Sequence, residues 1–366
     1  MNSKMYIGNH SFILSFLICL STFTLKAQSS KHFVDSIAND FLAHKHSSCI
    51  VIGIIDHGKQ KIYSYGNLNK NGGLPADSNT LFEIGSLTKL FTATATAIEV
   101  HDGKLKYSDC LSTLLRGIHV PEYAGHEIKV IDLLHHTSGL PRIPTDLFAT
   151  GKNFDSLNPY ANYSRANLDS FIDKCRIRWM PGTSYSYSNL GYGLMGDILS
   201  RIEGKSYETV IREQIWEPLS MNRSKVVLSE DQKRNMASPY NQKGEPDHVW
   251  DFDALAGAGA IRSDITDMMK FLNASMNPWN IKDNKLRNAL IDCQTNLFSA
   301  DNGIKVGLGW HSEPYNFDRF YVHRGETGGY YSFIGFTKEG QKGLVILTNS
   351  QTETDEIAFK ILGSMN

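Results

Sequence analysis

Segments with strand character lie at the two ends of this 366-residue sequence, separated by a long stretch with helical character. Near the N-terminus, residues 48–55 and 61–65 are rich in β-branched side chains and are joined by a turn over residues 57–60. Four more strand candidates follow one another near the C-terminus, at residues 306–310, 319–323, 331–337 and 343–349. Strands at both ends of one chain bury their apolar faces most simply in a common core. The pattern therefore predicts one antiparallel sheet built from the two termini.

Apolar residues elsewhere recur mostly at helical spacing. The expected helices cover residues 31–46, 86–100, 129–134, 167–175, 191–203, 206–215, 264–274 and 354–362. The fold class predicted is therefore α/β, of the α+β type, with an antiparallel sheet flanked by helices and an inserted, mainly helical region. We expect a single catalytic domain over residues 28–366, with its α/β part at about 31–100 and 300–366 and the helical region at about 101–299.

The first 27 residues have the composition of a secretory signal peptide. Lys4 precedes an apolar run over residues 12–20, and Ala27 supplies a small residue at a cleavage point. The run is short for a membrane span, which favours a cleaved signal over a retained signal anchor. A lipoprotein signal at Cys19 is disfavoured because Ile18 is too bulky. The sequence thus predicts an exported protein, periplasmic or secreted, without a membrane attachment after cleavage.

Charge and cysteine usage narrow the choice of partners. The 37 basic and 38 acidic residues nearly balance, so no basic surface for nucleic acid is indicated. The cysteines beyond the signal, Cys49, Cys110, Cys175 and Cys293, form no Cys-x-x-Cys pair, which argues against a zinc or dithiol centre. Both disulfides and buried free thiols remain compatible with their spacing.

Ser86 and Lys89 stand three residues apart at the expected start of a helix. Residues at this spacing share a helix face, so the lysine amine can take the serine proton and create a nucleophile. Backbone N–H groups at a helix start also favour an oxyanion. The lysine can act as a base only if burial or a neighbouring cation lowers its pKa.

Three further motifs accompany this pair in the sequence. They are Tyr187-Ser188-Asn189, the turn-like His136-Thr137-Ser138-Gly139-Leu140-Pro141, and His323-Arg324-Gly325; a glycine-rich segment also covers residues 257–263. In this order they resemble the serine β-lactamase and penicillin-binding protein family, in its class C β-lactamase and D-alanyl-D-alanine carboxypeptidase branch. That branch also includes esterases and D-amino-acid peptidases. The resemblance covers residues 31–362 and implies a β-lactamase/transpeptidase-like fold.

The resemblance also implies roles for individual residues. Ser86 would be the acylated nucleophile, with Lys89 and Tyr187 as a proton-sharing pair of which either could be the base. Asn189, His323, Arg324 and Gly325 would contact the substrate, and the backbone N–H groups of Ser86 and Glu326 would form the oxyanion hole.

The His323-Arg324-Gly325 segment departs from the family pattern. His323 stands where many members have lysine, and Arg324 replaces a frequent hydroxyl residue. Because side chains alternate along a strand, Arg324 faces away from His323, and its role is either carboxylate recognition or structure.

Other candidate sites are less well supported. The adjacent histidines His135 and His136 cannot easily chelate one ion, so a structural role is predicted for them. No Gly-x-Ser-x-Gly elbow is present, which disfavours an α/β-hydrolase triad. The aromatic residues Trp250, Phe252, Tyr315 and Tyr330 receive no role.

The sequence thus predicts an exported serine hydrolase that forms an acyl-enzyme on Ser86 without a metal or cofactor. Its substrate would be a β-lactam or a peptidoglycan stem peptide of D-Ala-D-Ala type. An esterase or D-amino-acid amidase on the same scaffold is the first alternative. The second alternative, from another class, is a penicillin-binding or cell-wall binding protein that does not turn over.

Overall fold

The computed structural model describes residues 31–149, 154–300, 303, 305–315 and 318–365. Its centre is a nine-stranded sheet in the order β3-β2-β1-β13-β12-β11-β10-β9-β8, counted over the described residues, with antiparallel pairing throughout. The strands are β1 (Cys49–Asp56), β2 (Lys59–Asn69), β3 (Gly72–Pro75), β8 (Phe298–Ser299), β9 (Lys305–Val306), β10 (His311–Tyr315), β11 (Asp318–Glu326), β12 (Tyr331–Thr337) and β13 (Lys342–Thr348).

The two ends of the chain meet where β1 pairs with β13, with Ile52 opposite Ile346. On its other side β1 forms a tight hairpin with β2, and the two turn residues His57 (φ 47°) and Gly58 (φ 79°) both have positive φ. Such a turn matches the twist of the strands it joins. The prediction of one antiparallel sheet built from both termini is confirmed.

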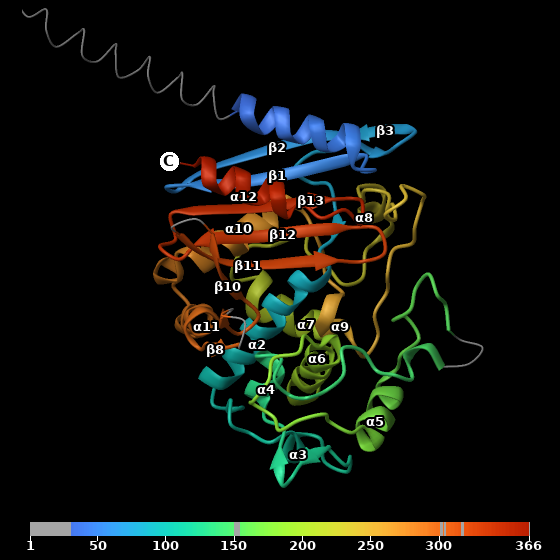
Figure 1. Ribbon diagram of the computed structural model, residues 1–366, viewed down its shortest axis with the longest axis vertical. Helices are drawn as coiled ribbons and strands as arrows, with labels where there is room; N and C mark the ends of the chain where they lie inside the picture. The colour runs from blue at the N-terminus through green and yellow to red at the C-terminus, as the bar shows by residue number, and fades with distance from the viewer. Residues whose placement is uncertain (1–30, 150–153, 301–302, 304, 316–317, 366) are drawn as a thin grey trace, which may run out of the picture.

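Alternate side chains of β1 pack into two different cores. Ile50, Ile52 and Ile54 pack with the N-terminal helix, helical over residues 31–44, and with α12 (Asp355–Ser364). Val51 and Ile55 belong to the larger core on the opposite face, where α10 (Ile265–Met276) contacts β1 and β13. Figure 1 shows α10 behind the sheet and α12 in front of it.

The helical region lies below the sheet in the view of Figure 1 and is threaded by α2 (Thr88–His101). Its other helices are α3 (Leu111–Leu114), α4 (Val130–Leu134), α5 (Arg165–Lys174), α6 (Asn189–Glu203), α7 (Tyr207–Ile211), α9 (Ala256–Gly259) and α11 (Asn284–Thr295). Helix α8 (Glu230–Arg234) appears instead at the level of the sheet in this view. The described residues also form two small two-stranded sheets. One pairs β4 (Phe82–Glu83) with β7 (Arg262–Ser263), and the other pairs β5 (Glu122–Tyr123) with β6 (His126–Glu127).

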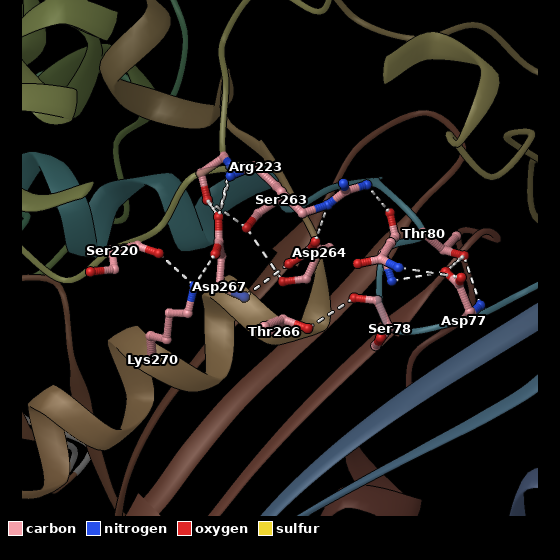
Figure 2. A network of polar contacts seen from close by, with 12 residues as sticks. Asp77, Ser78, Thr80, Ser220, Arg223, Ser263, Asp264, Thr266, Asp267 and Lys270 are labelled. Atoms are coloured by element: carbon pink, nitrogen blue, oxygen red, sulfur yellow. Dashed lines mark hydrogen bonds and ion pairs between the residues drawn. The ribbon is translucent and has the colours of Figure 1, made fainter. Parts of the chain in front are cut away.

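A buried polar network fixes the start of α10 (Figure 2). Asp264 caps the helix by accepting the Asp267 N–H at 2.8 Å, and its other oxygen accepts from Arg223 Nε at 2.6 Å. Asp267 accepts from the Arg223 and Ser224 backbone N–H groups and from Lys270 Nζ. The network ties the loop before α8, which contains Arg223 and Ser224, to the helix that packs against the sheet.

Some sequence predictions require correction. Residues 307–310 form a turn rather than a strand, because Gly309 has φ 85° and the chain doubles back there. The strand instead follows at β10, whose Pro314 and polar residues gave no strand signal. Helix α11 was not predicted. The four described cysteines, Cys49, Cys110, Cys175 and Cys293, are free thiols. The predicted signal peptide lies outside the described residues.

Candidate active site

Ser86 lies in a short 3-10 turn, η1 (Gly85–Leu87), that leads into α2. Lys89 Nζ is 2.9 Å from Ser86 Oγ and 2.7 Å from the carbonyl oxygen of Ala258, which accepts from it. The Ala258 carbonyl can approach because α9 packs backbone to backbone on α6: a Cβ on Gly257 would lie 2.5 Å from the Tyr192 carbonyl oxygen. The glycine-rich segment therefore positions a partner for the lysine.

The Lys89 side chain is completely buried, with an exposed fraction of 0%. Burial, and then the positive charge of Arg142, lowers the pKa of its ammonium group well below the ordinary value. Within the described part of the chain it forms no ion pair with a carboxylate. Burial thus favours the neutral form of an amine that lies against the serine hydroxyl, as the spacing of the two residues predicts.

Two basic side chains lie near the ring of Tyr187. Lys89 Nζ is 4.9 Å and Arg142 Cζ is 5.0 Å from the centroid of its ring. Burial raises the pKa of the Tyr187 phenol, and its hydrogen bond with Ser86 offsets only part of that rise. Since the pKa of the Tyr187 phenol is raised and that of the Lys89 amine is lowered, the structure favours Lys89 over Tyr187 as the base at neutral pH.

Asn189 begins α6, and the preceding Ser188 caps the helix by accepting the Gly191 N–H at 3.0 Å. The Asn189 Oδ1 atom is buried without a hydrogen-bond partner, and the side chain lines a cleft together with Ser86. An amide with one open oxygen can accept a hydrogen bond from a substrate N–H group.

Strand β11 brings the third motif to the serine. A Cβ on Gly85, which has φ +49°, would lie 2.7 Å from the Glu326 backbone nitrogen, so the two main chains touch beside Ser86. Gly325 is equally constrained: a Cβ there would lie 2.0 Å from the Ile84 carbonyl oxygen. Glycine at position 325 therefore admits the nucleophile turn, where the sequence had suggested that it admits substrate.

His323 is buried next to this turn. Its Nδ1 donates to the Arg324 carbonyl oxygen at 2.7 Å, which leaves Nε2 as an open acceptor with no partner among the described residues. Burial, with nearby His311 and Lys89, holds the pKa of the imidazole well below its ordinary value. A neutral ring therefore occupies the position where many family members have a cation.

The expectation that Arg324 contacts substrate is wrong. Its guanidinium binds both carboxylate oxygens of Glu313, at 2.7 and 2.9 Å, and also pairs with Asp355 at the start of α12. These partners hold Arg324 on the face of the sheet that α12 covers, opposite to Ser86. The alternation along the strand gave the correct face, and the structural role is the one observed.

Several cleft residues had not been identified from the sequence. Tyr160, Trp250, Phe252 and Thr327 line the cleft with Ser86, Asn189, Ala258, Gly259 and Glu326. Tyr160 stacks on Phe252 with ring centroids 4.7 Å apart. Trp250 and Phe252 had been noted in the sequence as aromatics that could line a cleft, but they were given no role. Tyr160 and Thr327 lie in loops, where no periodic pattern marks them. Tyr315 packs instead on Phe359, and Tyr330 is fully buried.

The neighbouring histidines serve as packing and hydrogen-bonding groups. His136 Nδ1 accepts the Ser188 N–H at 3.0 Å and its ring contacts Tyr187, while His135 Nε2 donates to the Asn296 carbonyl oxygen. Among the residues that the structure describes, no three His, Cys, Asp or Glu side chains are placed to hold a metal ion.

The whole-chain comparisons agree with this arrangement. The family model described as "Beta-lactamase" matches residues 34–361. The chain therefore belongs to the beta-lactamase family and is a serine hydrolase. It is 25% identical to a beta-lactamase of Pseudomonas fluorescens, over 93% of this chain and 100% of that protein.

Two further similar proteins come from the carboxypeptidase and the class C beta-lactamase parts of the family. The chain is 27% identical to the D-alanyl-D-alanine-carboxypeptidase/endopeptidase AmpH of Escherichia coli, over 72% of this chain and 68% of AmpH. A solved class C beta-lactamase superposes with a TM-score of 0.80 at 27% identity, covering 92% of this chain and 97% of that one. The family predicted from the sequence motifs and the fold class are confirmed.

Proposed function

We propose that this hydrolase acts through an acyl-enzyme on Ser86, with β-lactams or D-Ala-D-Ala-type peptides as substrates. The observation that carries the proposal is the 2.9 Å contact between Ser86 Oγ and a fully buried Lys89 amine. Relatives named as beta-lactamases and as a D-alanyl-D-alanine carboxypeptidase support the substrate class.

In the acylation step Lys89 accepts the Ser86 proton while Oγ bonds to the substrate carbonyl carbon. The backbone N–H groups of Ser86 and Glu326 stabilise the oxyanion, and Asn189 Oδ1 accepts from the substrate amide. When the tetrahedral intermediate collapses, the bond to the leaving group breaks. The Tyr187 phenol donates its proton to that group and is restored from the Lys89 ammonium. Water then attacks the acyl ester, which releases the acid and frees Ser86.

Mass spectrometry of the protein with penicillin over time tests the proposal. We expect a mass increase that maps to the peptide containing Ser86 and then declines at the rate of deacylation. Fast decline would indicate a β-lactamase, and a stable adduct a carboxypeptidase or a binding protein. A wild-type protein that acquires no adduct, or an adduct mapped to another residue, would contradict the assignment of Ser86.

The β-lactamase, carboxypeptidase and esterase alternatives differ in the kind of bond that is hydrolysed. A panel of nitrocefin, D-Ala-D-Ala peptides and p-nitrophenyl esters compares β-lactamase, carboxypeptidase and esterase activity on one preparation. Strong ester turnover without peptide release or nitrocefin hydrolysis would overturn the substrate class in favour of the esterase.

Export is the second part of the proposal, since residues 1–27 have the pattern of a cleaved signal. The mature protein is then expected to begin at Gln28 and to be found outside the cytoplasm. N-terminal sequencing of the protein from its native host tests this, and a mature chain that retains Met1 would contradict it. Within the described residues, no helix is long and apolar enough to cross a membrane.

A further inference from the structure

β-Lactams such as penicillin and peptides that end in D-alanine both carry a carboxylate, and a cation beside the cleft would bind it by charge-assisted hydrogen bonds. Three basic side chains near Ser86 are not available for this role. Arg324 is paired with Glu313 and Asp355. Lys89 is a buried amine bonded to Ala258, and His323 is a buried ring with a lowered pKa.

Arg142 is different because its side chain is exposed and, in the described part of the chain, forms no ion pair with a carboxylate. Its backbone is fixed beside the cleft: its carbonyl oxygen accepts the N–H groups of Asn189, at 2.8 Å, and Leu190, at 3.2 Å. The guanidinium carbon lies 5.0 Å from the Tyr187 ring centroid. A positive charge is therefore held against the ring of a catalytic candidate.

The charge of Arg142 also reaches both walls of the cleft. Burial raises the pKa of Tyr160 on the helical wall and of the Glu326 carboxyl on the strand wall, and the charge of Arg142 offsets a small part of each rise. Glu326 is hydrogen-bonded to Gln351, so it does not occupy the guanidinium. Contact with an aromatic ring uses the face of a guanidinium and leaves its in-plane N–H donors available for two parallel bonds to a carboxylate.

We propose that Arg142 binds the carboxylate of the substrate and makes the enzyme select anionic over neutral substrates. This inference rests on the acyl-enzyme function proposed above and adds to it the residue that recognises the negative charge of the substrate. The carboxylate belongs either to the leaving group or to the acyl chain, and matched substrates distinguish the two.

Two pairs of thioesters provide the test. In the first pair the leaving group ends in a carboxylate or in a carboxamide; in the second pair the acyl chain does. The preference is the ratio of kcat/KM within a pair. Wild-type protein is expected to prefer the carboxylate in one pair, and that pair identifies the source. Arg142→Gln is expected to lower this preference about tenfold, the size of a lost charge-assisted hydrogen bond.

Two control variants separate charge recognition from a general effect. Arg142→Lys keeps the charge without the two-pronged geometry, so it should retain part of the preference. Arg116→Gln removes an exposed arginine on the loop after α3, which lines no part of the cleft, and should retain all of it. No preference in the wild type for either pair, or a preference unchanged in Arg142→Gln, would overturn the inference.

Acylation of Ser86 keeps the two proposals distinguishable. If the wild-type protein forms the penicillin adduct on Ser86 and yet shows no dependence on Arg142, only the inference about Arg142 fails. If no adduct forms on Ser86 at all, the acyl-enzyme mechanism fails first.

Discussion

The starts of α2 and α10 both present free N–H groups and the positive end of a helix dipole, but they place opposite kinds of side chain there. At α10, Asp264 accepts the helix N–H of Asp267, and both carboxylates face the positive end of the helix dipole with partners for their oxygens. At α2 no side chain caps the helix and the first turn contains no acid; instead the helix start buries Lys89 at the end of the dipole that disfavours a positive charge. The first arrangement stabilises the fold, whereas the second depresses the pKa of an amine next to Ser86.

The same contrast extends to the surrounding polar atoms. In the network of Figure 2 the buried oxygens of Asp264 and Asp267 have donors. Around Ser86, the buried atoms Asn189 Oδ1, His323 Nε2 and Thr327 Oγ1 have no hydrogen-bond partner among the described residues. Unsatisfied buried groups destabilise a protein. Because Asn189 and Thr327 line the cleft, their open atoms are available to a substrate. Substitutions in the two regions should therefore separate activity from stability.

The largest effect is expected from Ser86→Ala, which removes the nucleophile. Hydrolysis should fall by at least about 10³-fold, and covalent labelling by a fluorescent penicillin should vanish. The melting temperature should change little, because only one hydroxyl group is lost. Labelling that persists in this variant would refute the nucleophile assignment.

Lys89→Met sharpens the comparison most directly. Acylation should fall by about 10³-fold, since Lys89 is the one amine among the described residues that hydrogen-bonds to Ser86 Oγ. The free energy of unfolding should remain the same or rise, because an apolar chain of similar length replaces a buried amine that has no carboxylate partner. Urea unfolding and acylation rates measured on the same preparation test both parts. A large loss of stability would show that Lys89 holds the fold together.

Asp267→Ala is the counterpart in α10. It leaves the N–H groups of Arg223 and Ser224 without an acceptor and Lys270 without a counter-ion. The free energy of unfolding should fall by about 3 kcal/mol, while the folded protein keeps its acylation rate. Lys270→Met, which removes only the more exposed partner, should cost less. If folded Asp267→Ala protein also lost its acylation rate, the start of α10 would not serve stability alone, and the contrast with the start of α2 would fail.

The sequence predicted the local motifs more accurately than the residues around them. The contact between Ser86 and Lys89 follows from their helical spacing, and their roles follow from the resemblance that the accompanying motifs carry. The two-ended sheet follows from strand-like segments at both termini. Arg324 could be placed on the correct strand, but its partners Glu313 and Asp355 come from other elements and were invisible in the pattern. Arg142 and the aromatic cleft residues lie in loops, where no periodicity reveals which way a side chain points.

The smallest effect concerns the electrostatics of Lys89 and requires a pH profile. The charged or titratable side chains whose fields couple to Lys89 are Arg142, His136, His311 and His323. The pKa of each of these three histidines is lowered, to about 4 for His311, so they are largely neutral at pH 7. Arg142 is then the permanent charge that disfavours the Lys89 ammonium.

Removing that charge by Arg142→Gln should raise the pKa of Lys89. Because the neutral amine is the base, activity is lost as pH falls through this pKa, so the acidic limb of the kcat/KM profile should move to higher pH. A neutral substrate is used, so that lost carboxylate binding does not contribute, and the shift should shrink at high salt because Arg142 is exposed. Arg142→Lys should leave the limb in place. A limb that moves to lower pH in Arg142→Gln would mean that the titrating base is not Lys89.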